Sequence, residues 1–220
     1  ATGGGAAWTA KNNWALRTRF PSADHTAMLV PPCPDITGRV LEARPRHGLG
    51  PDHAAIRRGV RYLLENQESN GSWYGRWGVN YVYGTCFALR GLRAADPQAA
   101  KASMLRAVRW LQSVQQDDGG WGESCTSYAK RHFVPAASTP SQTAWALLGL
   151  AAAGDTTSGT VQRGVRFLLE RQGVDGHWGE EGTTGTGFPG VFYLTYHMYP
   201  HYFPLLALGA LAAAWRDDTP

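Results

Sequence analysis

One short pattern occurs three times along this chain of 220 residues. Each copy has an arginine followed by a small residue, then an aromatic–leucine pair, a glutamine, and a glycine two residues before a tryptophan. The glutamine precedes the tryptophan by six residues in every copy: Gln67 and Trp73, Gln115 and Trp121, Gln172 and Trp178. A recurring unit of this kind restricts the chain to similar supersecondary units that stack side by side.

Each copy is typical of a helix end followed by a tight turn. Apolar residues at helical spacing lead to the glutamine, and the glycine after the polar turn can adopt positive φ. We expect the tryptophan to fold back onto the helix end and stack over the glutamine amide. Second helical segments are predicted over Tyr81–Ala95, Ser141–Ala153 and Phe192–Trp215. Strand signals are weak, because period-2 alternation is never sustained. The sequence therefore predicts an all-α fold of helix hairpins, with the tryptophan turns as structural ties.

Composition excludes several classes of protein. Aromatic residues make up 11% of the chain, too many for a disordered protein. The net charge of +4 comes without a dense basic run, which argues against nucleic acid as a partner. The three cysteines are widely spaced and indicate neither a zinc site nor a disulfide framework. The longest apolar stretch, Pro204–Trp215, is too short to span a bilayer.

The triple pattern resembles the QW repeat of squalene–hopene and oxidosqualene cyclases. Four further segments resemble the same family, the bacterial squalene–hopene cyclases in particular: Pro34–Glu42, Gly71–Tyr81, Ser138–Trp145 and Gly185–Gly190. The likeness runs from about residue 3 to about residue 211 and corresponds to the C-terminal third of those enzymes.

The resemblance implies an α/α barrel of helix hairpins, incomplete without the helices that precede it in the family. Residues 1–220 would form a single unit. Within it, residues 1–50 would form an irregular segment at the cavity and its entrance, including the start of a helix at Asp35 and Arg39. Residues 51–220 would form the QW-repeat hairpins.

Polyene cyclisation needs an acid that protonates a terminal alkene, a dry cavity, and groups that stabilise carbocations. In the family the acid belongs to a D-x-D-D motif, and no such motif occurs in this sequence. The acidic pairs at 117–118, 180–181 and 217–218 are predicted to lie in solvated turns. We therefore expect a second polypeptide to supply the acid.

Asp35 and Arg39 are the candidate support for that acid. They lie four residues apart, on one face of a helix. By resemblance they match positions that hydrogen-bond and polarise the catalytic aspartate, and a cation beside an acid strengthens it as a proton donor. The structural alternative is an ordinary ion pair at a helix start.

Aromatic residues are the candidates for binding substrate and cations. By resemblance, Trp77 and Tyr83 shape the substrate cavity, and Arg76 neighbours them in sequence. A second set matches the cation-stabilising aromatics of the family: Phe188, Phe192, Tyr196 and Tyr199. Their spacing predicts one stripe of a helix, with Phe188 before the helix proper because Pro189 follows it. Without the resemblance, such a stripe is more typical of a core.

The N-terminal stretch departs from the family pattern. Trp8 matches an active-site tyrosine or phenylalanine position, and Thr9, Ala10 and Lys11 stand where the family has an acidic pair. An altered product, or lost activity, is the consequence to expect. No metal or cofactor is predicted, since Asp24 and His25 lack a third ligand at suitable spacing.

The functional prediction is a component of a class II terpene cyclase that acts on squalene or a related polyprenyl substrate. We expect it to be cytoplasmic, with at most peripheral contact with the membrane. One alternative is a non-catalytic isoprenoid-binding or scaffold protein derived from a cyclase. Another α/α-barrel class, such as a carbohydrate-active enzyme, ranks lower, because it would need paired carboxylates at the cavity.

Overall fold

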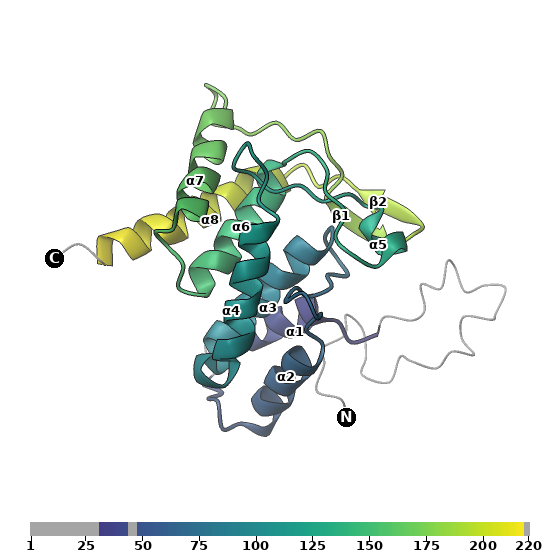
Figure 1. Cartoon of the computed structure of the whole chain (residues 1–220), viewed down its shortest axis with the longest axis vertical. Coiled ribbons are helices and arrows are strands. Elements are labelled where there is room, and N and C mark those ends of the chain that lie inside the picture. The colour runs from purple at the N-terminus through teal and green to yellow at the C-terminus, as the bar shows by residue number, and fades with distance from the viewer. Residues whose placement is uncertain (1–30, 44–47, 218–220) are drawn as a thin grey trace.

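The computed structural model describes residues 31–43 and 48–217, so Trp8 and the rest of residues 1–30 lie outside this description. Helices dominate the described part of the chain, together with one antiparallel pair of short strands (Figure 1). The elements are α1 (Pro34–Ala43), α2 (Ala54–Glu65), α3 (Tyr81–Ala95), α4 (Pro97–Ser113), α5 (Ser127–Lys130), α6 (Pro140–Ala152), α7 (Gly159–Arg171), β1 (Gly185–Phe188), β2 (Phe192–Leu194) and α8 (Tyr199–Asp217).

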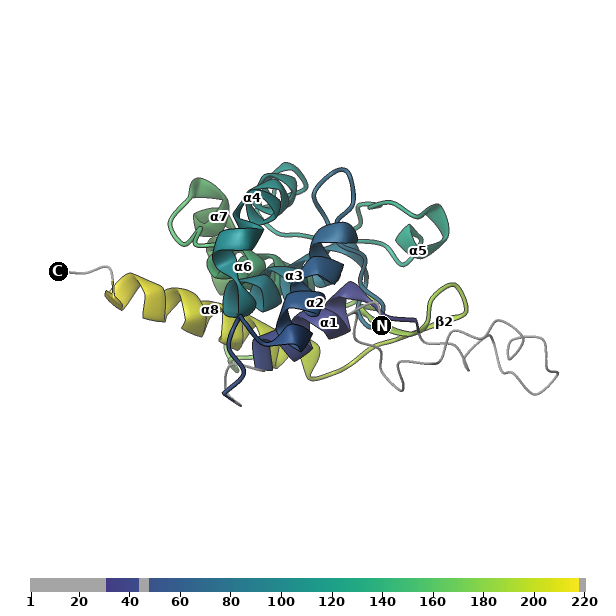
Figure 2. The same ribbon diagram turned by 90° about the horizontal axis from the view of Figure 1, so that it is seen from below.

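The helices form two rows. Helices α1, α3, α6 and α8 pack in that order as an inner row, and α2, α4 and α7 cover it from outside. Figure 2 shows α1 and α8 on the side of α3 and α6 that faces away from α4 and α7, so the inner row is curved. Alternation between a curved inner row and an outer row is the layering of an α/α barrel. The prediction of an all-α fold of helix hairpins is confirmed.

The two central inner helices, α3 and α6, are apolar on nearly every side. In α6 every residue from Pro140 to Leu150 is buried, as expected of a helix surrounded by others. Glycines allow α1 to lie directly against α3. A Cβ at Gly38 would stand 2.1 Å from the carbonyl oxygen of Phe87, and one at Gly91 would stand 2.5 Å from that of Gly38. Any side chain at these two positions would push the helices apart.

The tryptophan turns close the ends of the outer helices. Each indole Nε1 donates a hydrogen bond to the carbonyl of the leucine ten residues earlier, at 2.7 Å for Trp73, 2.9 Å for Trp121 and 2.8 Å for Trp178. These carbonyls lie in the last turns of α2, α4 and α7, where the regular i to i+4 donors of the helix run out. The glycine of each turn has positive φ, as predicted. The indole therefore folds back onto its helix end through a hydrogen bond.

The predicted helix over Phe192–Trp215 is wrong at its beginning. Phe188 ends β1, Phe192 begins β2, and α8 starts only at Tyr199. Glycines explain the difference, because a Cβ at Gly187 would stand 2.0 Å from the Phe192 ring and one at Gly185 would stand 2.4 Å from the Tyr196 ring. The two rings pack directly against the backbone of β1, so the four aromatics do not form one helical stripe.

We expect the buried indoles to hold the turns in place. Trp121 is fully buried, and replacing it with phenylalanine removes its Nε1–H donor and leaves the Leu111 carbonyl without this partner. Together with the lost volume, Trp121→Phe should lower the free energy of unfolding by about 2–4 kcal/mol, measured by denaturant titration.

Trp215→Phe is the matched control. Trp215 also donates Nε1–H to a backbone carbonyl, that of Thr156, but it is 37% exposed. Its replacement should cost less than about 1 kcal/mol, since water can satisfy the carbonyl. Equal losses at the two positions would contradict a structural role for the turns.

Candidate active site

A buried carboxylate joins the start of α1 to the loop after the first tryptophan turn. Asp35 has no exposed surface, and its Oδ2 accepts hydrogen bonds from the backbone N–H groups of Arg76 at 3.1 Å and Trp77 at 3.0 Å. Its Oδ1 is buried without a well-formed hydrogen bond among the described residues. Burial raises the pKa of Asp35 above its usual value, although the Cys33 thiol and the N–H donors partly offset the rise. A buried, half-satisfied carboxyl group is typical of functional sites.

Arg39 lies one turn further along α1 and binds a different partner. Its guanidinium donates a hydrogen bond to the Tyr83 hydroxyl at 2.9 Å and covers the Phe87 ring at 3.9 Å. In the described part of the chain no salt bridge joins Asp35 to Arg39. The ordinary ion pair at a helix start is therefore not formed, because α3 and the loop before it bind both side chains.

The first of two aromatic groups surrounds Arg39. Tyr83 contacts Trp145 at 4.8 Å between ring centroids, Trp145 contacts Tyr199 at 5.8 Å, and Tyr199 contacts Tyr196 at 4.6 Å. Phe203 completes this group through edge-to-face contacts with Trp145 and Tyr199. Neither Trp145 nor Phe203 is among the site residues predicted from the sequence. A uniformly apolar helix such as α6 offers no periodic signal to mark Trp145.

The second aromatic group surrounds Arg76. Its guanidinium lies 4.5 Å from the Trp77 ring and 5.6 Å from the Phe188 ring, and it donates a hydrogen bond to the Gly187 carbonyl at 3.0 Å. Phe188 in turn contacts Phe192 edge to face at 5.1 Å. The Trp77 indole N–H is buried without a partner in the described residues. The structure thus brings together Trp77, Phe188 and Phe192.

Asp35 connects the two aromatic groups, since it holds the backbone of Arg76 and Trp77 and shares α1 with Arg39. A pocket of about 420 Å³ adjoins Arg76 and Phe188, and another of about 350 Å³ adjoins Arg39 and Phe87. Tyr83 is only 2% exposed, whereas Phe192 is 40% exposed and Tyr196 is 38% exposed. The two exposed rings are therefore the ones most available to a ligand.

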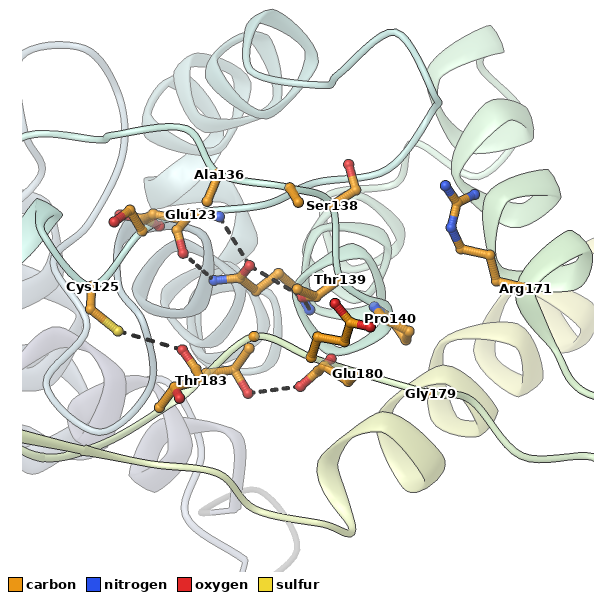
Figure 3. A pocket seen from close by; sticks show the side chains of 16 residues that line it. Glu123, Cys125, Ala136, Ser138, Thr139, Pro140, Arg171, Gly179, Glu180 and Thr183 are labelled. Carbon is orange, nitrogen blue, oxygen red and sulfur yellow. Dashed lines mark hydrogen bonds between the residues drawn. The ribbon is translucent and has the colours of Figure 1, made fainter.

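Two glutamates follow tryptophan turns and cap inner helices. Glu123 is buried and accepts hydrogen bonds from the backbone N–H groups of Asn80, Tyr81 and Val82, at the start of α3. Glu180 accepts from the backbone N–H of Ser141 at the start of α6. Both line a pocket of about 600 Å³ between the segment before α6 and the one before β1 (Figure 3).

The prediction of a solvated turn at 180–181 is wrong for Glu180, because the turn brings its carboxylate back to the N-terminus of α6. The signal lies in the repeat itself, where Trp-Gly-Glu occurs at 121–123 and again at 178–180. Asp117 and Asp118 are exposed and sit at a turn, as predicted.

Residues 31–43 and 48–217 show neither a metal-binding cluster nor a membrane-spanning helix. No group of three or more histidine, cysteine, aspartate or glutamate side chains there could hold a metal ion. No helix in the same ranges combines the length and apolar character needed to cross a bilayer.

Comparison with solved structures identifies the class of fold. The chain superposes on the type II terpene cyclase MstE from Scytonema in complex with merosterolic acid A, with a TM-score of 0.66 at 19% identity, over 96% of this chain and 62% of that one. It also superposes on ent-copalyl diphosphate synthase from Streptomyces platensis, with a TM-score of 0.60 at 23% identity, over 83% of this chain and 34% of that one. The fold is that of the type II terpene cyclases, an α/α barrel.

Sequence comparison gives the family. The model of the family "Squalene-hopene cyclase C-terminal domain" matches residues 1–213. The squalene–hopene cyclase of Zymomonas mobilis is 45% identical over 99% of this chain and 33% of its own length. The squalene–hopene cyclase of Alicyclobacillus acidocaldarius is 45% identical over 95% of this chain and 33% of its own length. The dammaradiene synthase of Dryopteris crassirhizoma is 43% identical over 94% of this chain and 34% of its own length. The chain belongs to the squalene–hopene cyclase family and spans about a third of the length of these relatives.

Glu123 should make folding stability depend on pH. Burial raises its pKa to about 7 from 4.5, against the lowering effect of three backbone N–H donors. The folded state therefore binds the proton more tightly than the unfolded state does, so stability is greatest below about pH 4.5 and falls as the pH rises through 7. Over that range the contribution lost is about 3 kcal/mol.

The measurement compares the free energy of unfolding of the native chain with that of Glu123→Gln between pH 5 and pH 8. Glutamine does not titrate, so the difference between the two proteins isolates Glu123 from the other acids. The amide also places a donor against N–H groups, but this cost does not depend on pH. A difference that stays constant with pH would show that Glu123 does not titrate in this range.

Proposed function

We propose that this chain forms the cavity-shaping, cation-stabilising part of a class II terpene cyclase, with the acid supplied by a second polypeptide that carries D-x-D-D. The observation that carries the proposal is the Asp35 carboxyl group, which is fully buried, held through Oδ2 and without a well-formed hydrogen bond at Oδ1 among the described residues. Leaving a buried acceptor unpaired costs free energy, so such a group in a folded protein calls for an explanation. A carboxylic acid from outside these residues would be a suitable hydrogen-bond donor to Oδ1.

Asp35 would act as a positioning residue. A hydrogen bond from the acid to Oδ1 would orient the acid, and the nearby Arg39 guanidinium would favour loss of its proton. That proton would add to the terminal alkene of the substrate, and the electron pair of the alkene would form the new C–H bond and leave a carbocation. Without a D-x-D-D motif in its own sequence, the chain alone would not start this reaction.

The aromatic groups support the second part of the proposal. An aromatic face attracts a cation through its quadrupole and offers no lone pair that would capture it. Rings from α3, α6, the β1–β2 hairpin and α8 form the two groups, and the buried Asp35 carboxylate lies between them. Squalene or a related polyprenyl chain is the substrate class proposed. Because such substrates partition into lipid, peripheral contact with a membrane belongs to the same proposal.

The test is incubation with squalene, with product analysis by gas chromatography and mass spectrometry. The chain alone should give no cyclised product. Co-expression with the remaining two thirds of the Zymomonas mobilis squalene–hopene cyclase should give cyclised product, and Asp35→Asn in this chain should lower kcat and shift its pH profile. Absence of product in both cases would favour the isoprenoid-binding or scaffold alternative.

Phe192→Leu tests cation stabilisation within that complex. Leucine keeps the apolar surface of this 40% exposed residue but removes the ring face. Loss of a cation–π interaction of about 1–2 kcal/mol corresponds to a roughly 5–30-fold lower kcat, with KM little changed.

Phe133→Leu is the control, since Phe133 packs on Trp110 of the outer helix α4, away from both aromatic groups. It should leave kcat within about twofold. A Phe192→Leu variant that retains full kcat and the same product would contradict the assigned role of this ring.

A further inference from the structure

The first two tryptophan turns each bind the next outer helix. In the first turn, the Gln67 amide donates to the Gly71 carbonyl at 2.8 Å and to the Ser103 carbonyl of α4 at 2.9 Å. The guanidinium of Arg106, three residues after Ser103, donates to Gln67 Oε1. Both ends of the glutamine side chain are thereby used: Nε2 bonds its own turn and the neighbouring helix, and Oε1 bonds the neighbouring helix alone.

The second turn repeats these contacts with the next helix in the row. Gln115 donates to the Gly119 carbonyl at 2.8 Å and to the Thr160 carbonyl of α7 at 2.9 Å. Arg163, again three residues further on, donates to Gln115 Oε1. The recognition element on each receiving helix is therefore a backbone carbonyl followed, one turn later, by an arginine.

The third turn has the same shape and no receiving helix. Gln172 donates to its own turn carbonyl, Gly176, at 2.9 Å, and among the described residues its Oε1 and second N–H have no partner from another helix. Gln172 and Gly176 are both exposed, whereas Gly71 and Gly119 are buried.

The space above the third turn is also open. A Cβ at Gly71 would stand 2.7 Å from the Arg106 carbonyl oxygen, and one at Gly119 would stand 2.7 Å from that of Arg163. A Cβ at Gly176 would meet only the chain's own Gln172, at 3.9 Å. The neighbouring apolar side chains are uncovered as well, with Leu169 56% exposed and Val174 fully exposed.

We propose that the third turn, Gln172–Trp178, is a docking surface for an outer helix of the second polypeptide. The helix it fits presents a backbone carbonyl to Gln172 Nε2 and, three residues later, an arginine to Gln172 Oε1, with its backbone packed on Gly176. This inference rests on the proposed function, which requires a second polypeptide. It also agrees with the length of the relatives, of which this chain spans about a third.

Helix α2, at the other end of the outer row, helps to decide which partner binds the third turn. In α2, Ala55 and Arg58 stand where α4 has Ser103 and Arg106, and Arg58 is exposed with no partner among the described residues. A second copy of this chain could offer α2 to the third turn, but this head-to-tail contact would propagate into an open filament unless its rotation closed a ring. In α4 the Ser103 hydroxyl accepts a hydrogen bond from Arg106 at 3.1 Å, and Ala55 has no hydroxyl to do the same for Arg58. One partner that binds both ends satisfies Gln172 and Arg58 together.

The test is co-expression of this full chain with the remaining two thirds of the Zymomonas mobilis squalene–hopene cyclase, with an affinity tag on the latter. The amount of this chain that co-purifies is measured without squalene. The native chain should co-purify in a 1:1 ratio, and Gln172→Ala should reduce the yield of complex at least tenfold. Gln162→Ala is the matched control, because Gln162 lies on α7, which Gln172 follows directly, and is likewise exposed with one hydrogen bond to a backbone carbonyl. It should leave the yield unchanged.

Gly176→Ala is a second, steric variant, since its methyl group would enter the space that the docking helix needs. Gly154→Ala controls for the strain of positive φ, because Gly154 has φ 89° and open space around it, against φ 81° for Gly176. Gly176→Ala should lower the yield of complex at least tenfold and Gly154→Ala should not.

Three results would overturn the proposal: no co-purification of the native chain, equal yields with the variants and their controls, or a self-associating native chain that Gln172→Ala converts to monomer. A complex that depends on Gln172 but does not cyclise squalene would leave the docking surface standing and count against the proposed function. Cyclisation that is unaffected by Gln172→Ala and Gly176→Ala would do the reverse.

Discussion

The hydrogen bond from each turn tryptophan to the leucine carbonyl ten residues before it is the interaction on which the rest of this structure depends. It gives a donor to a carbonyl in the last helical turn, where regular helix donors run out, and it fixes the turn against that helix. A fixed turn places its glutamine at a constant position, from which the side chain reaches the next outer helix. The spacing between helices in the row therefore follows from one local contact, repeated.

The same turns set the inner row through buried carboxylates. Glu123 accepts hydrogen bonds at the N-terminus of α3, and Glu180 accepts one at the N-terminus of α6. The second and third turns therefore each fix the beginning of an inner helix that precedes them in the sequence. Asp35 does the corresponding work for α1, by holding the loop that follows the first turn. All three carboxyl groups have their pKa raised by burial. Each accepts at least one backbone N–H that would otherwise lack this partner, which offsets the cost of burying the carboxyl group.

The sequence was sufficient to predict what is encoded locally. The boundaries of α3 and α6, the three turns and their positive-φ glycines follow from periodicity and from residue types at fixed offsets. What it could not predict depends on contacts between distant segments. The hairpin at 185–194 looks helical by aromatic spacing alone, and only the Tyr196 and Phe192 rings lying on Gly185 and Gly187 explain why it is extended. Likewise, Asp35 and Arg39 look like an ion pair until α3 is packed beside them.

The two arginines divide the aromatic residues by electrostatic environment. Arg39 lies over Phe87, and Arg76 lies over Trp77 and closer to it than to Phe188, so these ring faces are already engaged by a positive charge. A carbocation near them would be repelled by the guanidinium while it is attracted by the ring, and the repulsion is strong in a water-excluded site. Phe192 and Tyr196 contact other rings, and no guanidinium covers them among the described residues. In the proposed reaction, positive charge would therefore be best stabilised near Phe192 and Tyr196, away from the Arg39 guanidinium that would assist the acid.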